Sequence, residues 1–449
     1  MASTYLTRQI TSAGSRKKAT ISLWVKRGSG FGNDQRWFSY ENTSASTNVT
    51  VFKFSGDSIQ FADQTGGSNN ARYDGTRKLR DPNAFYHFLV KMDTTQATNT
   101  DRLKIYINGE LQSEASYTYP SQNADLNIGH NSNAYIDIGR WRTNNNQYFD
   151  GLITHFHYTD GYAYDASSFG ETDSTSGIWK PKTAPSVTYG TNGFFLKFEN
   201  SGNMDLDSSG NNLTFTTSGN LTQNVDTPSN NFCTFNGVNP YSGTLSNGNL
   251  KMSQASYDYN VQGTLGMESG KYYWEYKIDG LYGEFGVCEQ GKAGQSDPQA
   301  NIGFYFLYNN GNTTGYIWNN ATAGSQSSTI TIPAFASGMI INLAYDADNK
   351  ALYIGQNGTW LNSGDPTSGA SKTGALITNL YPRFGGTIVP FCGHGTSNTT
   401  ANYEANFGQG YFGTTAVASA GTAPSEGGIF EYNCPNGYQA LCTKGINSF

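Results

Sequence analysis

The segment FYHFLVKMDTTQATNTDRLKIYINGE, residues 85–110, decides the fold class. Its two ends, residues 85–93 and 102–110, are rich in the aromatic and β-branched side chains that β-strands favour. A polar stretch separates them. The second run ends in Asn108-Gly109, a dipeptide that tolerates positive φ at both central positions of a tight hairpin turn. The segment therefore predicts consecutive β-strands joined by turns.

The same pattern continues along the chain. Residues 19–27 alternate Ile21, Leu23 and Val25 with other side chains, which predicts a strand with one buried aliphatic face. We find no sustained helical periodicity. Aromatic residues make up 14% of the chain, charged residues only 14%, and glycines number 53. This composition is typical of an all-β protein with Gly- and Asn-rich turns. A length of 449 residues predicts two or three domains.

The second half repeats these signals. GKYYWEYKIDG, residues 270–280, predicts a strand, and residues 338–360 predict a hairpin with a DADNK turn. We predict a first domain over residues 1–185 and a second over residues 236–449. Residues 186–235 are predicted to be a connector, with one strand that packs on the first domain.

Several motifs of residues 1–185 resemble the laminin-G-like form of the concanavalin A-like lectin fold. They are Trp24-Val25-Lys26, Trp37-Phe38, residues 85–93, residues 105–110 and YFDGLITHFHYTDG at 148–161. The closest form occurs in virion proteins of tailed bacteriophages, which carry segments very similar to residues 93–110 and 169–182.

Residues 236–449 resemble the SPRY domain. The shared pattern is the YYWE strand, a Gly-Val strand, the hairpin that ends in Asn-Gly, then LYP and NFG. The two resemblances imply two concanavalin A-like antiparallel β-sandwiches (jelly rolls) in tandem. SPRY domains bind partners through loops at one end and are not enzymes, so the same is expected of this part of the chain.

Charge and hydropathy exclude several classes of partner. The net charge is −6, and no run of Lys or Arg exceeds residues 16–18, which argues against nucleic acid as a partner. No apolar stretch approaches 18 residues, so no membrane span is predicted. The first residues lack the apolar core of a signal peptide, so export on such a signal is not expected.

The five cysteines all lie in the second half of the chain. An odd number without a CxxC pair is a poor disulfide framework and a poor zinc site. Free, buried thiols are therefore predicted, and a Cys434–Cys442 bridge is the main alternative.

HFHYTDGYAYDASSFGETD, residues 155–173, has the residue types of an active site. His155 and His157 are two apart, so in a regular strand they point the same way, and we expect them on a solvated face. Glu171 and Asp173 are also two apart, but Ser176 stands where lectin-fold glycanases carry a third carboxylate. We expect a loop here rather than catalysis, with Trp179 packed on the sandwich.

One metal candidate remains. Asp205, Asp207 and Ser209 match the start of a calcium loop, but the twelfth position is Thr216 instead of a bidentate Glu. A turn stabilised by the Asp207 side chain explains the run equally well. Calcium is therefore possible only at this site, and no other cofactor is expected.

Ligand contacts are predicted in loops that combine aromatic and amide side chains. The loops are residues 140–148, 307–320 and 393–403, and the candidate ligand-binding residues are Trp141, Arg142, Asn144, Tyr148, Tyr316 and Trp318. Such loops suit sugar rings and protein interfaces alike. A structural alternative is that Trp141 and Trp318 fill the ends of the sandwiches.

The resemblance implies a non-enzymatic phage virion protein, made and assembled in the host cytoplasm. We favour a tail-fibre or adhesin-like role, with a host-surface glycan or other receptor as the partner. A capsid decoration protein, head fibre or tail subunit is the alternative, favoured by the early start of the first sandwich, and a glycan depolymerase comes third. Edge strands predict contacts with other virion proteins and a homo-oligomer.

Overall fold

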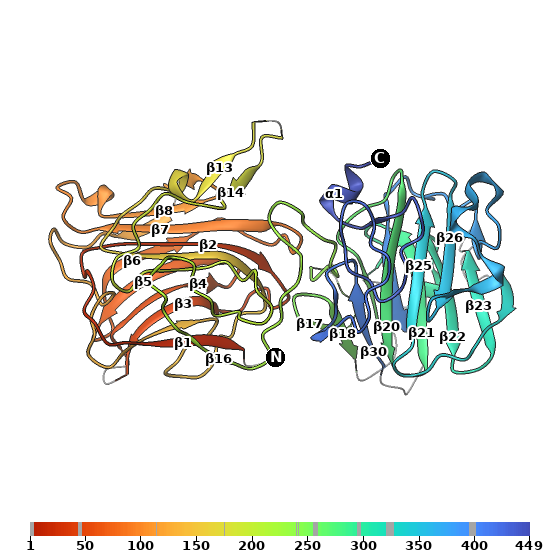
Figure 1. The fold of residues 1–449 in the computed structure, drawn as a ribbon, viewed down its shortest axis with the longest axis horizontal. Coiled ribbons are helices and arrows are strands. Elements are labelled where there is room, and N and C mark those ends of the chain that lie inside the picture. Colours follow the sequence, from red (N-terminus) through yellow and green to blue (C-terminus); the bar gives the residue numbers. More distant parts are fainter. Residues whose placement is uncertain are drawn as a thin grey trace. The chain divides into compact units, whose positions relative to one another are not determined.

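The computed structural model describes residues 4–43, 47–113, 115–174, 176–238, 240, 242–254, 259–293, 298–319, 327–394 and 401–449. The chain divides into two compact units, Met1–Gln223 and Asn224–Phe449 (Figure 1). Each is built almost wholly of antiparallel β-strands. The all-β prediction is therefore confirmed.

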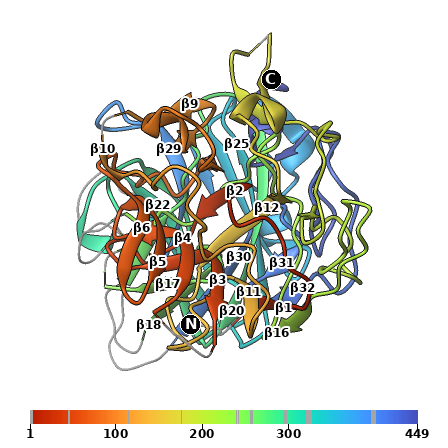
Figure 2. The same ribbon diagram turned by 90° about the vertical axis from the view of Figure 1, so that its left-hand side faces the viewer.

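The first unit contains an eight-stranded sheet, several of whose strands face the viewer in Figure 2. In spatial order its strands are β10 (Ala115–Thr118), β6 (Ser68–Gly75), β5 (Ser58–Thr65), β4 (Val49–Ser55), β3 (Gln35–Asn42), β11 (Ala134–Ile138), β1 (Tyr5–Ile10) and β16 (Thr216–Ser218). A turn joins β4 to β5 and another joins β5 to β6, so this half of the sheet is a meander.

A six-stranded sheet forms the other layer of the first unit. Its strands, in order, are β15 (Phe194–Leu196), β12 (Gly151–Asp160), β2 (Lys18–Arg27), β7 (Phe85–Asp93), β8 (Leu103–Ile107) and β9 (Glu110–Leu111). The predicted Asn108-Gly109 turn joins β8 to β9, with φ of 50° and 83° at the two residues. A separate hairpin pairs β13 (Gly170–Thr172) with β14 (Trp179–Pro181).

Side chains of both sheets meet in one core. Trp37 is fully buried there, stacked on Phe88 with ring centroids 4.6 Å apart and met edge-on by Phe54. Burial of a large aromatic side chain contributes about 1.5–3 kcal/mol relative to exposure. Alternation along the strands places Ile21, Leu23 and Val25 in this core, as predicted.

The opposite face of β2 is also buried, contrary to the one-sided strand that alternation predicts. Trp24 on that face is 2% exposed and stacks on His87 of β7 at 4.9 Å. A second apolar cluster, which includes Leu89 and Phe169, lies on the same side of the sheet. A strand buried on both faces need not alternate strictly, so its second buried face is hard to recognise from sequence.

The second unit also has two main sheets. The larger one contains β17 (Thr244–Ser246), β18 (Lys251–Gln254), β30 (Ala401–Asn406), β20 (Lys271–Asp279), β25 (Ile340–Asp346), β26 (Ala351–Gln356) and β27 (Thr359–Trp360) in order, with β28 (Ile377–Thr378) paired to β26 and β33 (Gln439–Ala440) paired to β20. The other contains β19 (Tyr259–Gln262), β29 (Ile388–His394), β21 (Tyr282–Glu289), β22 (Phe304–Asn310), β23 (Thr314–Asn319) and β24 (Ser328–Thr331). A short hairpin pairs β31 (Tyr411–Phe412) with β32 (Thr415–Ala416).

Helical structure in the described residues is slight. The only α-helix is α1 (Thr443–Ile446), and the 3-10 turns are η1 (Asn99–Asp101), η2 (Ala166–Ser168), η3 (Pro298–Ala300), η4 (Leu361–Ser363) and η5 (Pro366–Ser371). None of the helices in the described ranges has the length and apolarity needed to cross a membrane.

The predicted connector divides between the two units. Phe195 of β15 lies opposite His157 of β12, and Thr216 of β16 lies opposite Thr7 of β1, so these residues belong to the first unit. Phe232 and Phe235 instead lie in the hydrophobic clusters of the second unit. The unit boundary falls between Gln223 and Asn224.

The five cysteines are free and buried. The thiol prediction is confirmed, and Cys434 and Cys442 are not bridged. Burial raises the pKa of the Cys392 and Cys434 thiols well above the ordinary range. These thiols therefore act as small apolar core groups.

Candidate functional site

The predicted binding loop 140–148 follows β11, which lies between β3 and β1 in the eight-stranded sheet. In β11, Ile136 and Ile138 point into the core, so Tyr135 and Asp137 lie on the opposite, outer face. The loop then folds back on itself, because Trp141 N–H donates to the Asn146 carbonyl at 2.8 Å. This closure fixes the loop beside the outer face of the sheet.

Arginine and aromatic side chains alternate across this region. Three guanidinium groups lie over three rings: Arg36 over Trp141 at 4.0 Å, Arg140 over Tyr5 at 3.4 Å and Arg142 over Tyr135 at 3.9 Å. A planar guanidinium stacks well on an aromatic face, and each such contact contributes about 0.5–2 kcal/mol. The rings are thus held in fixed positions before any ligand arrives.

Two buried carboxylates organise the same region. Asp137 accepts from Arg142 Nε at 2.6 Å and lies 3.4 Å from Arg140 Nη2. Glu41 accepts from the backbone N–H of Arg142 and from Thr143 Oγ1. Arg142 also donates to Thr7 Oγ1. The guanidinium of Arg142 is therefore committed to protein partners, and its role is to position the loop and Tyr135.

The groups left available to a ligand are mainly aromatic and amide. Tyr5, Tyr135, Trp141 and Tyr148 are half-buried, and Asn144 is exposed. We call these five residues the aromatic surface. Tyr148 is fixed by its hydroxyl, which donates to Asn145 Oδ1 at 2.7 Å. Rigid rings beside an exposed amide can stack on the apolar face of a sugar and hydrogen-bond its hydroxyls.

Tyr316 and Trp318 belong to β23 of the second unit. Trp318 is 9% exposed and packs beside Phe306 and Phe391 in a hydrophobic cluster, which leaves little of its surface for a ligand. Tyr316 is half-buried beside Tyr308, with ring centroids 5.7 Å apart. Asn320 and residues 395–400 of the other two predicted loops lie outside the described residues.

The expectation that His155 and His157 share a solvated face is wrong. A β-bulge interrupts the pairing of β12 with β2 between Thr154 and His157, and His155 has φ of 48°. His157 is 1% exposed, bonded through Nδ1 to the Tyr189 hydroxyl at 2.9 Å. Burial lowers its pKa well below the ordinary value, and it lowers the pKa of His155 to about 4. Both imidazoles are neutral at pH 7.

The acidic pair of residues 155–173 lies on a hairpin instead of a loop. Glu171 is in β13, and Asp173 follows it. Both carboxylates face Lys180, whose Nζ lies 2.8 Å from Asp173 Oδ2 and 3.8 Å from Glu171 Oε1. Trp179 of β14 packs against the sandwich as predicted, because its Nε1 donates to His87 Nδ1 at 3.0 Å. Two carboxylates that share one lysine form an ion-pair cluster on the surface.

A Ser–His pair that sequence reasoning missed lies under this hairpin. Ser22 Oγ of β2 is 2.8 Å from His87 Nε2 of β7, and both residues are fully buried. Because His87 Nδ1 accepts from Trp179, the ring proton sits on Nε2 and is donated to Ser22. The imidazole therefore cannot take the serine proton. Burial also lowers the His87 pKa to about 3. Only the register of β2 with β7 brings the pair together, so no sequence spacing could have revealed it.

At the calcium candidate, the carboxylate of Asp207 already accepts hydrogen bonds from groups of the protein. Its Oδ1 accepts from the backbone N–H of Phe195 and Ser209, and its Oδ2 accepts from Ser209 Oγ and the N–H of Leu213. These four bonds close the turn, as the alternative explanation requires. Within the described ranges, no group of three or more His, Cys, Asp or Glu side chains is arranged to hold a metal ion.

Comparison with known proteins identifies the first unit. A family model described as the concanavalin A-like lectin/glucanases superfamily matches residues 2–167. No curated protein sequence matches the chain. Similar solved structures include the SPRY domain of human HERC1, at 14% identity over 38% of this chain and 96% of that chain, with a TM-score of 0.29.

The TRIM65 PSpry domain is similar at 14% identity over 39% of this chain and 91% of that chain, with a TM-score of 0.29. The native heptameric SAP-like pentraxin from Limulus polyphemus is similar at 13% identity over 36% of this chain and 71% of that chain, with a TM-score of 0.26. The assignment therefore rests on the family match and on the two facing sheets: the first unit is a concanavalin A-like β-sandwich, a lectin-like fold that indicates ligand binding in general.

Proposed function

We propose that this chain is a non-enzymatic binding protein and that its first unit recognises carbohydrate at the aromatic surface. The observation that carries the proposal is the set of arginine–aromatic stacks, which hold Tyr5, Tyr135 and Trp141 in place beside the exposed Asn144. Rings fixed in advance lose little conformational entropy when a sugar binds, so more of the contact energy contributes to affinity. The lectin-like fold supports the same conclusion.

The geometry of the acid–base groups favours binding over catalysis. The His87 imidazole is a donor to Ser22 and is sealed from solvent, so this pair supplies no activated nucleophile. The carboxylates of Glu171 and Asp173 share one ion-pair partner, Lys180. A retaining glycosidase needs one carboxyl free as an acid and the other as a nucleophile on opposite sides of the bond.

The biological setting we propose is the virion of a tailed phage, with this chain as a tail-fibre or adhesin-like component. Its support is the sequence resemblance of residues 93–110 and 169–182 to such virion proteins. The alternative in the same setting is a structural subunit or capsid decoration protein, because one fold serves both roles.

Glycan binding to the purified protein tests the proposal. Trp141→Ala and Tyr148→Ala should each weaken binding to host-surface glycan by about 1–3 kcal/mol, because each removes a stacking ring. Trp141→Phe should retain part of the affinity. Tyr162→Ala is the matched control. Tyr162 is 41% exposed in the same unit, but it follows β12 and does not belong to the aromatic surface. Melting temperatures of all variants verify that the fold is intact.

Two outcomes would overturn the proposal. Equal glycan affinity of the wild type and both alanine variants would show that the aromatic surface is not the binding site. Release of reducing ends from the glycan by the wild type would contradict the non-enzymatic role. For the adhesin role, purified protein should bind host cells and block infection. A protein that binds no cells but coats the particle in regular copies would establish the structural alternative.

A further inference from the structure

We propose that a pocket beside the aromatic surface binds the carboxylate of an acidic sugar, such as a uronic acid, through Arg8. The inference rests on the proposed carbohydrate-binding function and adds the chemical class of the ligand. Its basis is a half-buried arginine that lines a pocket and has no acceptor for its charge among the described residues.

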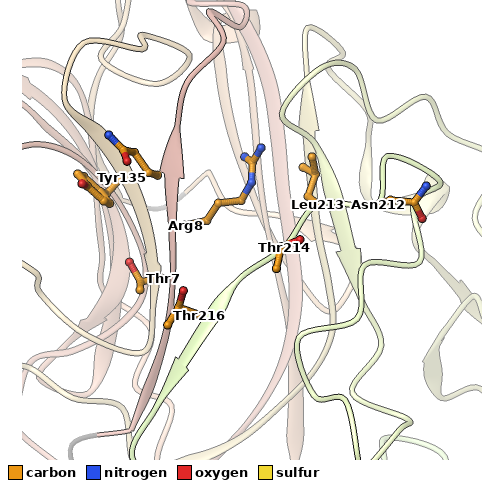
Figure 3. A pocket seen from close by; sticks show the side chains of 8 residues that line it. Thr7, Arg8, Tyr135, Asn212, Leu213, Thr214 and Thr216 are labelled. Carbon is orange, nitrogen blue, oxygen red and sulfur yellow. The ribbon is translucent and has the colours of Figure 1, made fainter.

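The pocket opens where two neighbouring strands separate. β16 pairs with β1 only from Tyr5 to Thr7, and the segment 212–215 then diverges from the edge of β1. The space has a volume of about 510 Å³, within the roughly 300–1,000 Å³ of small-molecule sites. β1 contributes Thr7 and Arg8 to its lining, β11 contributes Tyr135, and the diverging segment contributes Asn212, Leu213 and Thr214 (Figure 3).

Arg8 occupies a position that strand alternation reserves for an apolar side chain. Leu6 and Ile10, two residues to either side, are both buried in the core. Arg8 shares their face of the strand and extends from β1 on the side of Leu213 (Figure 3). A charged residue in such a position is costly unless another group compensates it. It is therefore an informative departure from the pattern.

The described residues compensate the Arg8 charge only in part. Arg8 makes no ion pair within 4.0 Å with any of them, and its Nη1 is buried without a hydrogen-bond acceptor. Burial lowers the pKa of Arg8, and the nearby negative charge of Asp207 acts against this effect. The Asp207 oxygens already accept four hydrogen bonds from Phe195, Ser209 and Leu213. An anion in the pocket that Arg8 lines would supply further negative charge.

The rest of the lining favours a sugar over a simple ion. Hydroxyls of Thr7 and Thr214 and the amide of Asn212 can bond the hydroxyls of a sugar ring, and Leu213 offers an apolar contact. Arg8 is the only cation of the lining, whereas a phosphate or sulfate ion is usually held by several donors with positive charge. Tyr135 lines the pocket and also belongs to the aromatic surface, so the pocket and the aromatic surface adjoin at this residue.

Paired titrations test the assignment. The probes are an oligogalacturonate, a neutral galactose oligosaccharide of equal length and inorganic phosphate. Wild type should bind the acidic probe about ten- to a hundredfold more tightly than the neutral one, because a charge-assisted hydrogen bond is added. Arg8→Gln should abolish this preference and leave neutral binding unchanged. Added salt should weaken only the acidic binding.

Arg72→Gln is the matched control. Arg72 lies in β6, which four strands separate from β1 in the same sheet, and pairs with Asp74 at 2.5 Å. Its loss removes the same charge without touching the pocket, so the acidic preference should persist. Arg8→Gln should not lower the melting temperature, because Arg8 has no ion-pair partner to lose. A clear fall in melting temperature together with an unchanged acidic preference would show that Arg8 has only a structural role.

The remaining outcomes separate this inference from the proposed function. Equal wild-type affinity for acidic and neutral probes would overturn the role of Arg8 while carbohydrate binding stands. If binding of the acidic probe depends on Arg8 but not on Trp141, the role of the pocket stands and the role proposed for the aromatic surface is overturned. Displacement of the acidic probe by phosphate at equal concentration would make the site a general anion site and overturn the sugar assignment. Binding of no oligosaccharide would overturn both.

Discussion

Glu275 shows how one buried residue organises a large part of the second unit. It lies on β20, fully buried, and its carboxylate accepts the backbone N–H groups of Glu431 and Tyr432, each at 2.9 Å. It also accepts from the Tyr273 hydroxyl at 2.8 Å. These bonds fasten the C-terminal segment over the outer face of β20. Burial raises the Glu275 pKa to about 7 despite the donors around it.

This raised pKa predicts that the second unit loses stability as the pH rises. The native state holds the Glu275 proton more tightly than the unfolded state, so the contribution of this group is full below pH 4.5 and is lost through about pH 7. The loss is on the order of 3 kcal/mol. Denaturant unfolding of the full chain from pH 4 to pH 8 measures it.

Glu275→Gln should flatten this pH dependence, because the amide does not titrate. It should also lower the free energy of unfolding by about 1–3 kcal/mol, because the NH₂ group of the new glutamine would face a backbone N–H donor where a carboxylate oxygen now accepts. Glu268→Gln, at an exposed glutamate of the same unit, should keep the wild-type profile. The same pH slope in the wild type and Glu275→Gln would refute the prediction.

At the scale of elements, the β13–β14 hairpin covers the outer face of the six-stranded sheet. Figure 1 shows the hairpin above β7 and β8. Its contact depends on close approach, since a Cβ atom added to Gly170 would lie 2.4 Å from the Trp179 ring. The indole stacks on His87 at 5.9 Å and shields the Ser22–His87 pair from water. The hairpin is therefore part of the sandwich and not an appendage.

Trp179→Ala should destabilise the first unit by about 2–4 kcal/mol, because it creates a cavity and leaves His87 Nδ1 without its donor. Ile178→Ala is the adjacent control. Its side chain is 60% exposed, so the change should stay within about 0.5 kcal/mol. Urea unfolding of both variants provides the comparison, and equal effects would contradict this account of the hairpin.

At the scale of the whole molecule, the chain contains two units with separate hydrophobic cores. Trp37 is buried in the core of the first and Trp274 in the core of the second. Each core gathers side chains from two facing sheets of its own unit. A unit that buries its own core has the main requirement for independent folding.

Residues 1–223 and 224–449, expressed separately, should therefore each give β-sheet circular dichroism and a cooperative unfolding transition. Limited proteolysis of the full chain should release two stable fragments by cleavage near Gln223, because the boundary between the two compact units falls there. Fragments that remain unfolded in isolation, beside a full chain that melts in one transition, would contradict this prediction.

The sequence by itself determined the fold class, several strands and some of the turns. Alternation placed Ile21, Leu23 and Val25 in the core, and Asn108-Gly109 marked its turn, because these signals depend on neighbours in the chain. Composition also indicated free thiols, which the structure confirms.

Only the tertiary structure decided which surfaces remain open and which polar groups meet. The second buried face of β2, the bulge at His155 and the Ser22–His87 pair depend on segments distant in sequence. The same holds for the pocket at Arg8, whose wall is formed by residues about 200 positions later. A residue's own neighbours fix the direction of its side chain, but the fold decides what covers that side chain, and the function proposed here depends on what is left uncovered.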